Sequence, residues 1–221
     1  KKQFCFIKKI KMISFVIPTL NELENVDFTV NKINNNFIDQ SDYEIIFVDD
    51  KSNDGTIEKI KSISQTQNNI KLIISDNRKG LGNALLLGQK NSNGDFIFFL
   101  DCDNSINSSD LKKLLQSKKN NALVIGSRYI KDSKINGVNF IKVILSRILN
   151  LIVSKYLNIS ALDISHSCRI FPKAIIFETN NLKHPVFFWE HSLFSSQKGY
   201  DILEIPVSFD ERKSGKTKNS F

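Results

Sequence analysis

The 221-residue chain has few cysteines, glycines and prolines, and it lacks long apolar runs. Its three cysteines, Cys5, Cys102 and Cys168, are odd in number and far apart. This excludes a disulfide framework or a Cys-x-x-Cys metal pair and favours a reducing compartment. The 9 glycines and 4 prolines exclude collagen-like and linker-dominated chains. Because no run of about 18 uncharged apolar residues occurs, the sequence predicts no membrane-spanning helix.

The charge of the chain is unbalanced toward the basic side. There are 31 Lys and Arg against 23 Asp and Glu, a net charge of +8, and 41% of residues are hydrophobic, which is typical of a folded protein. The excess of positive charge favours an anionic partner, either nucleic acid or the surface of a membrane. The basic residues are spread along the chain without a helix–turn–helix, zinc or RNP signature, so we expect no nucleic-acid partner.

The first half of the chain alternates strand-like and helical segments. Strands are expected over 13–18, 43–50, 70–75, 95–101 and 122–128, and helices near 23–38, 56–66, 81–91 and 109–118. Runs that are apolar on both faces suit parallel strands covered by helices, so we predict an α/β fold, Rossmann-like, with a mostly parallel sheet flanked by helices. The second half predicts a helix over 138–157, an aromatic-rich helix that includes 186–194, and a strand over 201–209.

Acidic residues follow several of these predicted strands, at the edge where open α/β sheets bind ligands. Asp101 and Asp103 are two residues apart, and two carboxylates on one side of an extended chain favour a bound cation between them. A hard ion such as Mg²⁺ prefers oxygen ligands from carboxylates and phosphates. The alternative is a solvated turn with helix-capping side chains.

Asp49-Asp50, Gly80-x-Gly82 and Glu22 each allow two interpretations. An acid at 49–50 could bind a nucleobase or ribose, or could cap the next helix. The Gly-x-Gly could contact a phosphate or only ease a turn, and Glu22 could be a first-turn helix acid.

Six segments in order now carry a resemblance: PTLNE, FVDDKSNDGT, GLGNA, GDFIFFLDCD, GSRY and EIPVSFDERKSGKTK. Together they resemble the family-2 glycosyltransferases with the GT-A fold, and among these the dolichol-phosphate (polyprenyl-phosphate) mannose synthases. The resemblance covers about residues 13–218. It implies a single GT-A domain over 12–210, with a nucleotide-sugar half (12–128), an acceptor half (129–210) and a flexible basic tail (211–221). Residues 1–11 are either a basic tail or a segment upstream of a native start at Met12.

The resemblance implies a nucleotide-sugar site. Its nucleoside contacts fall on Pro18, Leu20, Glu22, Val48 and Asp50. The DxD motif, Asp101-Cys102-Asp103, is expected to hold Mg²⁺ or Mn²⁺ and the donor diphosphate, with Asp101 and Asp103 as metal ligands. Arg128 is expected near donor and acceptor phosphates, and Arg212 and Lys218 form a clamp over the diphosphate. The expected catalytic residues are Asp101, Asp103, Arg128 and Arg212.

The resemblance also implies an acceptor phosphate site at Arg128, Lys142 and Ser146, of which the last two share a helix face. The sequence departs from the family's usual residues in having Leu20 in place of Tyr, Lys142 in place of Arg, and SHSCR in place of an SGFR-like loop. These departures concern base stacking, the bidentate phosphate fork and the acceptor loop.

The implied function is an inverting, metal-dependent transfer of a sugar, mannose from GDP-mannose, onto a polyprenyl or dolichyl phosphate. The alternative is a family-2 transferase that uses a UDP-sugar or a glycan hydroxyl in cell-surface polysaccharide synthesis. The implied location is cytoplasmic, peripheral to the cytoplasmic face of a membrane, with a membrane-protein anchor as a further partner. Helix 138–157 is expected to be partly buried with one exposed apolar face that contacts the membrane.

Four further residues have structural interpretations. We expect Glu190 to order the site rather than act as a base, Asp163 and Arg169 to pair, and His166 and His191 to have satisfied structural positions.

Overall fold

The computed structural model describes residues 11–37, 42–76, 79–103, 105–180 and 182–210. The strands are β1 (Ile13–Thr19), β2 (Tyr43–Asp49), β3 (Ile70–Ile74), β4 (Phe96–Phe99), β5 (Ala122–Ser127), β6 (Lys134–Asn136), β7 (Arg169–Pro172), β8 (Asp201–Pro206) and β9 (Ser208–Asp210). The helices are α1 (Leu23–Asn34), α2 (Thr56–Thr66), α3 (Leu81–Lys90), α4 (Ser108–Gln116), α5 (Phe140–Tyr156) and α6 (Val186–Gln197).

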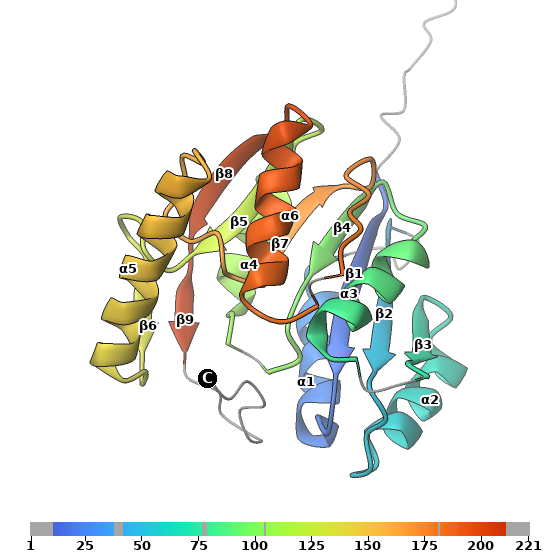
Figure 1. The fold of residues 1–221 in the computed structure, drawn as a ribbon. Helices are drawn as coiled ribbons and strands as arrows, with labels where there is room; N and C mark the ends of the chain where they lie inside the picture. The colour runs from blue at the N-terminus through green and yellow to red at the C-terminus, as the bar shows by residue number, and fades with distance from the viewer. Residues whose placement is uncertain (1–10, 38–41, 77–78, 104, 181, 211–221) are drawn as a thin grey trace, which may run out of the picture.

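A seven-stranded sheet forms the centre of the molecule, in the order β3-β2-β1-β4-β7-β5-β8 (Figure 1). Every neighbouring pair is parallel except the two that involve β7, which runs antiparallel to both β4 and β5. Two short strands, β6 and β9, pair in parallel as a second sheet. The expected mostly parallel α/β architecture is therefore confirmed.

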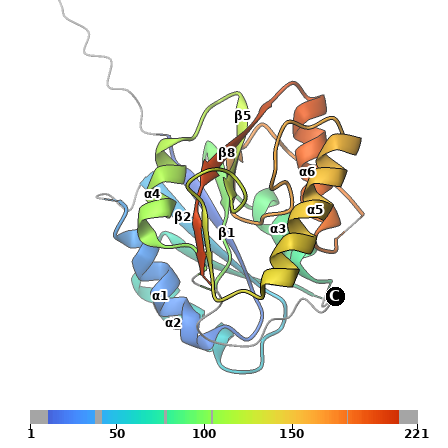
Figure 2. The ribbon, with the colours of Figure 1, turned by 90° about the vertical axis from the view of Figure 1, so that its left-hand side faces the viewer.

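Helices cover both faces of the large sheet (Figure 2). On one face, Val26 and Val30 of α1, Ile60 of α2 and Leu114 of α4 pack with Phe15 and its neighbours. On the other face, α3 and α6 pack against the side chains that alternate with these, such as Val16 and Phe99. Because strands with two buried faces need apolar residues at every position, the uninterrupted Ile/Val/Phe runs form the central strands.

Polar side chains mark where two of the helices begin. The side chain of Asn107 accepts a hydrogen bond from the backbone of Asp110 (2.9 Å) at the start of α4. Asn139 does the same for Ile141 (2.9 Å) at the start of α5. Each cap satisfies a backbone donor that the first turn leaves free.

The expected elements of the first half are all present, with ends that differ by a few residues. The helix expected over 23–38 ends at Asn34, and the strand expected over 95–101 ends at Phe99. In the second half, the sequence-based prediction missed β6 and β7. The strand expected over 201–209 is wrong as one element, because Val207 separates β8 from β9. Residues 1–10 and 211–221, which hold the expected tails, lie outside the described residues.

Gly88 lets α3 lie close against β1. An added Cβ at this position would meet Cγ1 of Val16 at 2.2 Å. Gly88 is therefore required by packing, although glycine disfavours a helix interior by about 1 kcal/mol relative to alanine.

We predict that Gly88→Ala lowers the free energy of unfolding by about 1–3 kcal/mol, because overpacking outweighs the gain in helix propensity. Urea unfolding followed by circular dichroism measures this. Lys90→Ala, at an exposed position of the same helix, is the matched control and should stay within about 0.5 kcal/mol of the parent. A stabilised Gly88→Ala protein would contradict the close packing.

Candidate active site

The carboxyl ends of β1, β2, β4 and β5 face one edge of the sheet, where the residues expected to bind donor and acceptor follow them. The ends of β4 and β5 are not direct neighbours, because β7 lies between these two strands. Since β7 is antiparallel, the loop 163–168 that precedes it lies at this same edge. The edge therefore carries acids, an arginine and one additional loop.

Two neighbouring acids at the end of β2 have different surroundings. Asp49 is fully buried and accepts hydrogen bonds from Thr19 Oγ1 (2.9 Å) and from both the backbone N–H and the hydroxyl of Ser52 (2.7 Å each). It therefore shapes the turn. Asp50 accepts one bond through Oδ2 from the backbone of Gly80 (3.1 Å), whereas its buried Oδ1 has no partner within the described residues. Asp50 thus has an oxygen free to accept a bond from a ligand.

The other expected nucleoside positions differ in what they offer. Pro18 and Leu20 are half-buried at the end of β1, and Glu22 is buried, with Oε2 accepting from Asn25 Nδ2 (2.8 Å). The side chain of Val48 is 0% exposed and lies in the core, so only the backbone of this residue could contact a nucleoside.

The DxD segment lies in a turn rather than on a strand. Because β4 ends at Phe99, Asp101 and Asp103 do not lie on an extended strand, and the expected placement of both carboxylates on one side of a strand is wrong. Asp103 Oδ1 accepts from the backbone of Ser105 (3.0 Å), and Asp101 Oδ2 accepts from the hydroxyl of Ser167. Cys102 is buried, with Sγ 3.6 Å from Thr29 Oγ1. The two carboxylates remain partly exposed while the residue between them anchors the turn.

A divalent cation fits this donor set only in part. Within the described ranges, no cluster of three or more His, Cys, Asp or Glu could hold a metal ion by itself. Mg²⁺ commonly takes one or two carboxylates and completes its shell with phosphate oxygens and water. Asp101 and Asp103 therefore fit a cation that arrives with a diphosphate, and do not form a closed protein site.

Arg128 forms the strongest ion pair of the site with Asp163. Its Nε and Nη2 donate to the two carboxylate oxygens at 2.8 and 2.7 Å, and its backbone N–H donates to Oδ2 at 2.9 Å. Burial acts against both charges, but the pairing outweighs it, so the pKa of Arg128 is raised and that of Asp163 is lowered. Both groups therefore stay ionised.

The expected pairing of Asp163 with Arg169 is wrong. The guanidinium of Arg169 is fully buried and donates to the backbone carbonyls of His166 (2.6 and 3.1 Å), Ile164 (3.0 Å) and Phe188 (3.2 Å). Burial without a hydrogen-bonded acid lowers its pKa to about 9. Arg169 ties the loop 163–168 to α6, which is a structural role.

Two of the expected acceptor residues, Arg128 and Ser146, are connected through Tyr129, although they lie in different elements. The hydroxyl of Tyr129, next to Arg128, donates to Ser146 Oγ on α5 (2.7 Å). One turn further along α5, Asn150 Nδ2 donates to the carbonyl of Ser146 and to Ser165 Oγ (both 2.9 Å). Lys142 is exposed one turn before Ser146. The connecting residues Tyr129 and Asn150 were not predicted, because neither lies in a recognisable motif.

The remaining expected residues have structural surroundings or lie outside the described chain. Glu190 accepts from the hydroxyl of Thr179, in keeping with an ordering role. His191 is fully buried, and its ring lies against Phe171 and Phe177. The expectation of a satisfied position is wrong for its Nε2, which has no hydrogen-bond partner within the described residues. Arg212 and Lys218 are beyond the described residues. The strand β9, which leads toward them, contacts the turn after the DxD segment through Asp210 N–H and Ser105 O (3.1 Å).

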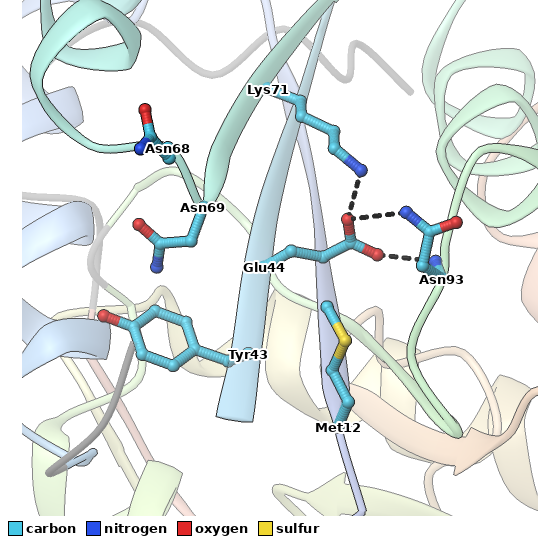
Figure 3. A pocket seen from close by; sticks show the side chains of 7 residues that line it. All are labelled: Met12, Tyr43, Glu44, Asn68, Asn69, Lys71 and Asn93. Carbon is cyan, nitrogen blue, oxygen red and sulfur yellow. Dashed lines mark hydrogen bonds and ion pairs between the residues drawn. The ribbon is translucent and has the colours of Figure 1, made fainter. Parts of the chain in front are cut away.

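A separate cavity of about 370 Å³ lies at the opposite edge, where β1, β2 and β3 begin (Figure 3). Its lining consists of Met12, Tyr43, Glu44, Asn68, Asn69, Lys71 and Asn93. The carboxylate of Glu44 accepts from Lys71 Nζ (2.5 Å), Ser14 Oγ (2.6 Å) and the backbone of Asn93 (2.5 Å). Burial opposes its charge, but these donors prevail and lower its pKa. Glu44 is thus a structural acid that joins three segments.

Comparison with known proteins identifies the family. Residues 14–178 match the model of glycosyl transferase family 2, and the chain belongs to this family of enzymes. This confirms the resemblance and the enzyme class inferred from the sequence.

Named relatives agree with one branch of that family. The chain is 35% identical over 136 residues to a dolichol-phosphate mannosyltransferase of Pyrococcus furiosus, with 61% of this chain and 38% of the relative covered. It is 26% identical over 212 residues to an undecaprenyl-phosphate mannosyltransferase of Micrococcus luteus, with 93% and 86% covered. The chain thus spans well under half of the first relative and most of the second.

Solved structures share the fold, which is of the GT-A type. A mannosyltransferase from Pyrobaculum calidifontis in complex with GDP-Man and Mn²⁺ superposes with a TM-score of 0.65 at 16% identity, covering 95% of this chain and 59% of the other. A glucosyl-3-phosphoglycerate synthase from Mycobacterium tuberculosis with Mn²⁺ and UDP gives a TM-score of 0.67 at 16% identity, covering 93% and 73%. At this identity the likeness concerns the fold.

We predict that the protein loses stability as the pH falls from about 6.5 toward 4. Burial lowers the pKa of His166 to about 3 and of His184 to about 4, whereas both titrate near 6.5 when unfolded. In this window the unfolded state binds protons that the folded state does not, so acid favours unfolding. Urea unfolding at pH 7, 6 and 5 measures the slope.

The variant His166→Gln should lower that slope by roughly one proton, about 1.4 kcal/mol per pH unit. Lys131→Gln, at an exposed position, serves as the control and should leave the slope unchanged. An unchanged slope in His166→Gln would contradict a buried, neutral His166.

Proposed function

We propose that the protein transfers a sugar, mannose from GDP-mannose, onto a polyprenyl or dolichyl phosphate, with inversion at the anomeric carbon. Membership of glycosyl transferase family 2 and the two mannosyltransferase relatives support this assignment. The observation that carries the choice of acceptor is the direct Tyr129–Ser146 bond, which links α5 to the residue whose ring lies under the Arg128 guanidinium. A cation and a hydroxyl on adjacent elements are suited to a phosphate group.

Donor binding rests on three acids at the carboxyl edge. Oδ1 of Asp50, which has no partner among the described residues, can accept a hydrogen bond from a nucleobase or ribose, and the Gly80 N–H keeps the carboxylate in place. Asp101 and Asp103 would hold Mg²⁺ or Mn²⁺. The bound ion supplies charge that offsets the negative charge of the leaving diphosphate. Arg212 and Lys218 are proposed to add to this from the tail.

The acceptor needs positive groups but no protein base. A phosphate monoester has a second pKa near ~6 and is largely dianionic at neutral pH, so its oxygen is already a nucleophile. Arg128, Lys142 and Ser146 are proposed to hold it. Asp163 occupies Nε and Nη2 of Arg128, and within the described chain Nη1 has no hydrogen-bond partner. That edge of the guanidinium is therefore the one offered to phosphate.

The bond from Thr179 to Glu190 supports an ordering role for Glu190.

A donor screen tests this function. Purified protein is incubated with Mn²⁺, a polyprenyl phosphate and radiolabelled GDP-mannose or UDP-sugars, and label is measured in the organic extract. We expect transfer from GDP-mannose into a lipid that mild acid cleaves. Asp103→Asn should lower kcat by about 100-fold or more, because the leaving diphosphate loses its counter-charge.

The controls separate chemistry from folding. Ser109→Ala removes an exposed hydroxyl that donates to Asn107 Oδ1 and should retain full activity. Urea unfolding shows whether Asp103→Asn is folded. Full activity of Asp103→Asn or in excess chelator would refute the metal role. Transfer only from a UDP-sugar, or only onto a glycan hydroxyl, would refute the assigned donor or acceptor and favour the alternative family-2 activity.

The helix α5 supports a peripheral membrane contact. Its buried residues are Asn150 and Ser154, whereas large apolar side chains face outward, such as Phe140 (75% exposed), Leu145 (62%) and Ile152 (60%). The exposed Lys142, Arg147 and Lys155 lie on the same helix. Exposed apolar residues beside cations are typical of a helix that lies in the interface of an anionic membrane. Within the described ranges, no helix meets the length and hydropathy that crossing a bilayer requires.

The expected mode is therefore attachment at the surface of the membrane from which a lipid phosphate enters. This places the proposed phosphate ligands Lys142 and Ser146 on the helix that touches the lipid. The expectations of a cytoplasmic location and of a membrane-protein anchor accompany this proposal.

Liposome flotation tests the contact. We predict that the parent floats with vesicles that contain anionic lipid at low salt, and that Leu145→Glu reduces the floated fraction several-fold by opposing burial of α5. Phe28→Glu replaces another exposed apolar residue, on α1 (55% exposed), and should float like the parent. Equal loss in both variants, or no binding by the parent, would contradict a contact through α5.

A further inference from the structure

The loop 163–168 contacts both ends of the proposed site. At its start, Asp163 holds the guanidinium of Arg128 with two hydrogen bonds. Near its end, the hydroxyl of Ser167 donates to Asp101 Oδ2 in the DxD turn. The two contacts follow from the topology, because the loop leads into β7, which pairs with β4 on one side and β5 on the other.

The loop is held firmly enough to position what it touches. Its carbonyls at Ile164 and His166 accept from the buried Arg169, and the backbone of Ser165 donates to Asn150 Oδ1 on α5 (3.0 Å). The ring of His166 donates through Nδ1 to the carbonyl of Gly126, since a carbonyl oxygen only accepts. A segment tied to β5, α5 and its own following strand has little freedom to shift.

The Ser167 hydroxyl is suited to fixing a metal ligand. Ser167 is 8% exposed, so its bond to Asp101 is sheltered from water. A carboxylate can only accept, so the hydroxyl proton lies between the two oxygens and fixes the orientation of the Asp101 carboxylate. Groups that hydrogen-bond to a metal ligand set its orientation and its basicity, and their loss commonly costs about 10- to 100-fold in metal affinity.

We propose that Ser167 is a positioning residue for Asp101, whose carboxylate it orients for a divalent cation that binds with the donor diphosphate. This inference rests on the proposed function. Ser167 belongs to the SHSCR segment, where the chain departs from the usual family loop.

Metal binding provides the test, independent of catalysis. Mn²⁺ is titrated into the full chain by electron paramagnetic resonance, with and without GDP as the probe diphosphate. We expect Ser167→Ala to weaken Mn²⁺ binding about 10-fold. Ser167→Thr keeps the hydroxyl and should restore affinity to within about 3-fold of the parent. Ser109→Ala, which loses an exposed hydroxyl, should bind like the parent.

A second readout separates positioning from general damage. In transfer assays, Ser167→Ala should raise the Mn²⁺ concentration for half-maximal rate while the KM for polyprenyl phosphate stays within about 2-fold, and urea unfolding should show a folded protein. Equal Mn²⁺ affinity in the parent and Ser167→Ala would overturn the inference alone. A parent that binds GDP-mannose but shows no Mn²⁺ binding would also overturn it. A parent that binds neither Mn²⁺ nor any sugar nucleotide would overturn the proposed function with it.

Discussion

The reversed direction of β7 is the constraint on which the rest of the site depends. A wholly parallel sheet would place the start of this strand at the amino edge, far from the proposed chemistry. Because β7 is antiparallel between β4 and β5, its preceding loop lies at the carboxyl edge, between Asp101 and Arg128. One loop can then support an acid of the proposed donor end and a cation of the proposed acceptor end.

Arg169 stabilises the conformation of this loop. A buried guanidinium without an acid is costly unless its donors are satisfied. Here the donors meet carbonyls of the loop and of α6, and the ring of Phe188 lies 4.6 Å from the guanidinium carbon. The consequence is that Asp163 remains available to Arg128. An Asp163–Arg169 pair would have left Arg128 without its carboxylate and the loop without its carbonyl contacts.

The parts of the fold that could be predicted from the sequence are those with long, uniform patterns. The uninterrupted apolar sequences of β1 and β2 predict strands that are buried on both faces. The alternation of such strands with helices along the chain predicts a parallel sheet. The four-residue β7 could not be found this way, because Arg169 begins it and its direction depends on partners 70 residues earlier. The family motifs placed the expected site residues at one edge, but hydrogen bonds such as Ser167 to Asp101 depend on that undetected strand.

The helix α5 shows how the protein uses polarity where apolar packing is usual. Its buried residues, Asn150 and Ser154, are both polar, and the amide of Asn150 bonds to Ser146 and to Ser165 of the loop. Several apolar residues of α5, such as Phe140, Leu145 and Ile152, keep most of their surface in water and therefore add little to the stability of the isolated fold. Their burial would release free energy only when α5 meets an apolar phase. Because the buried amide network joins α5 to the loop that holds Arg128, contact at the outer face and phosphate binding at the inner face would act on one connected unit.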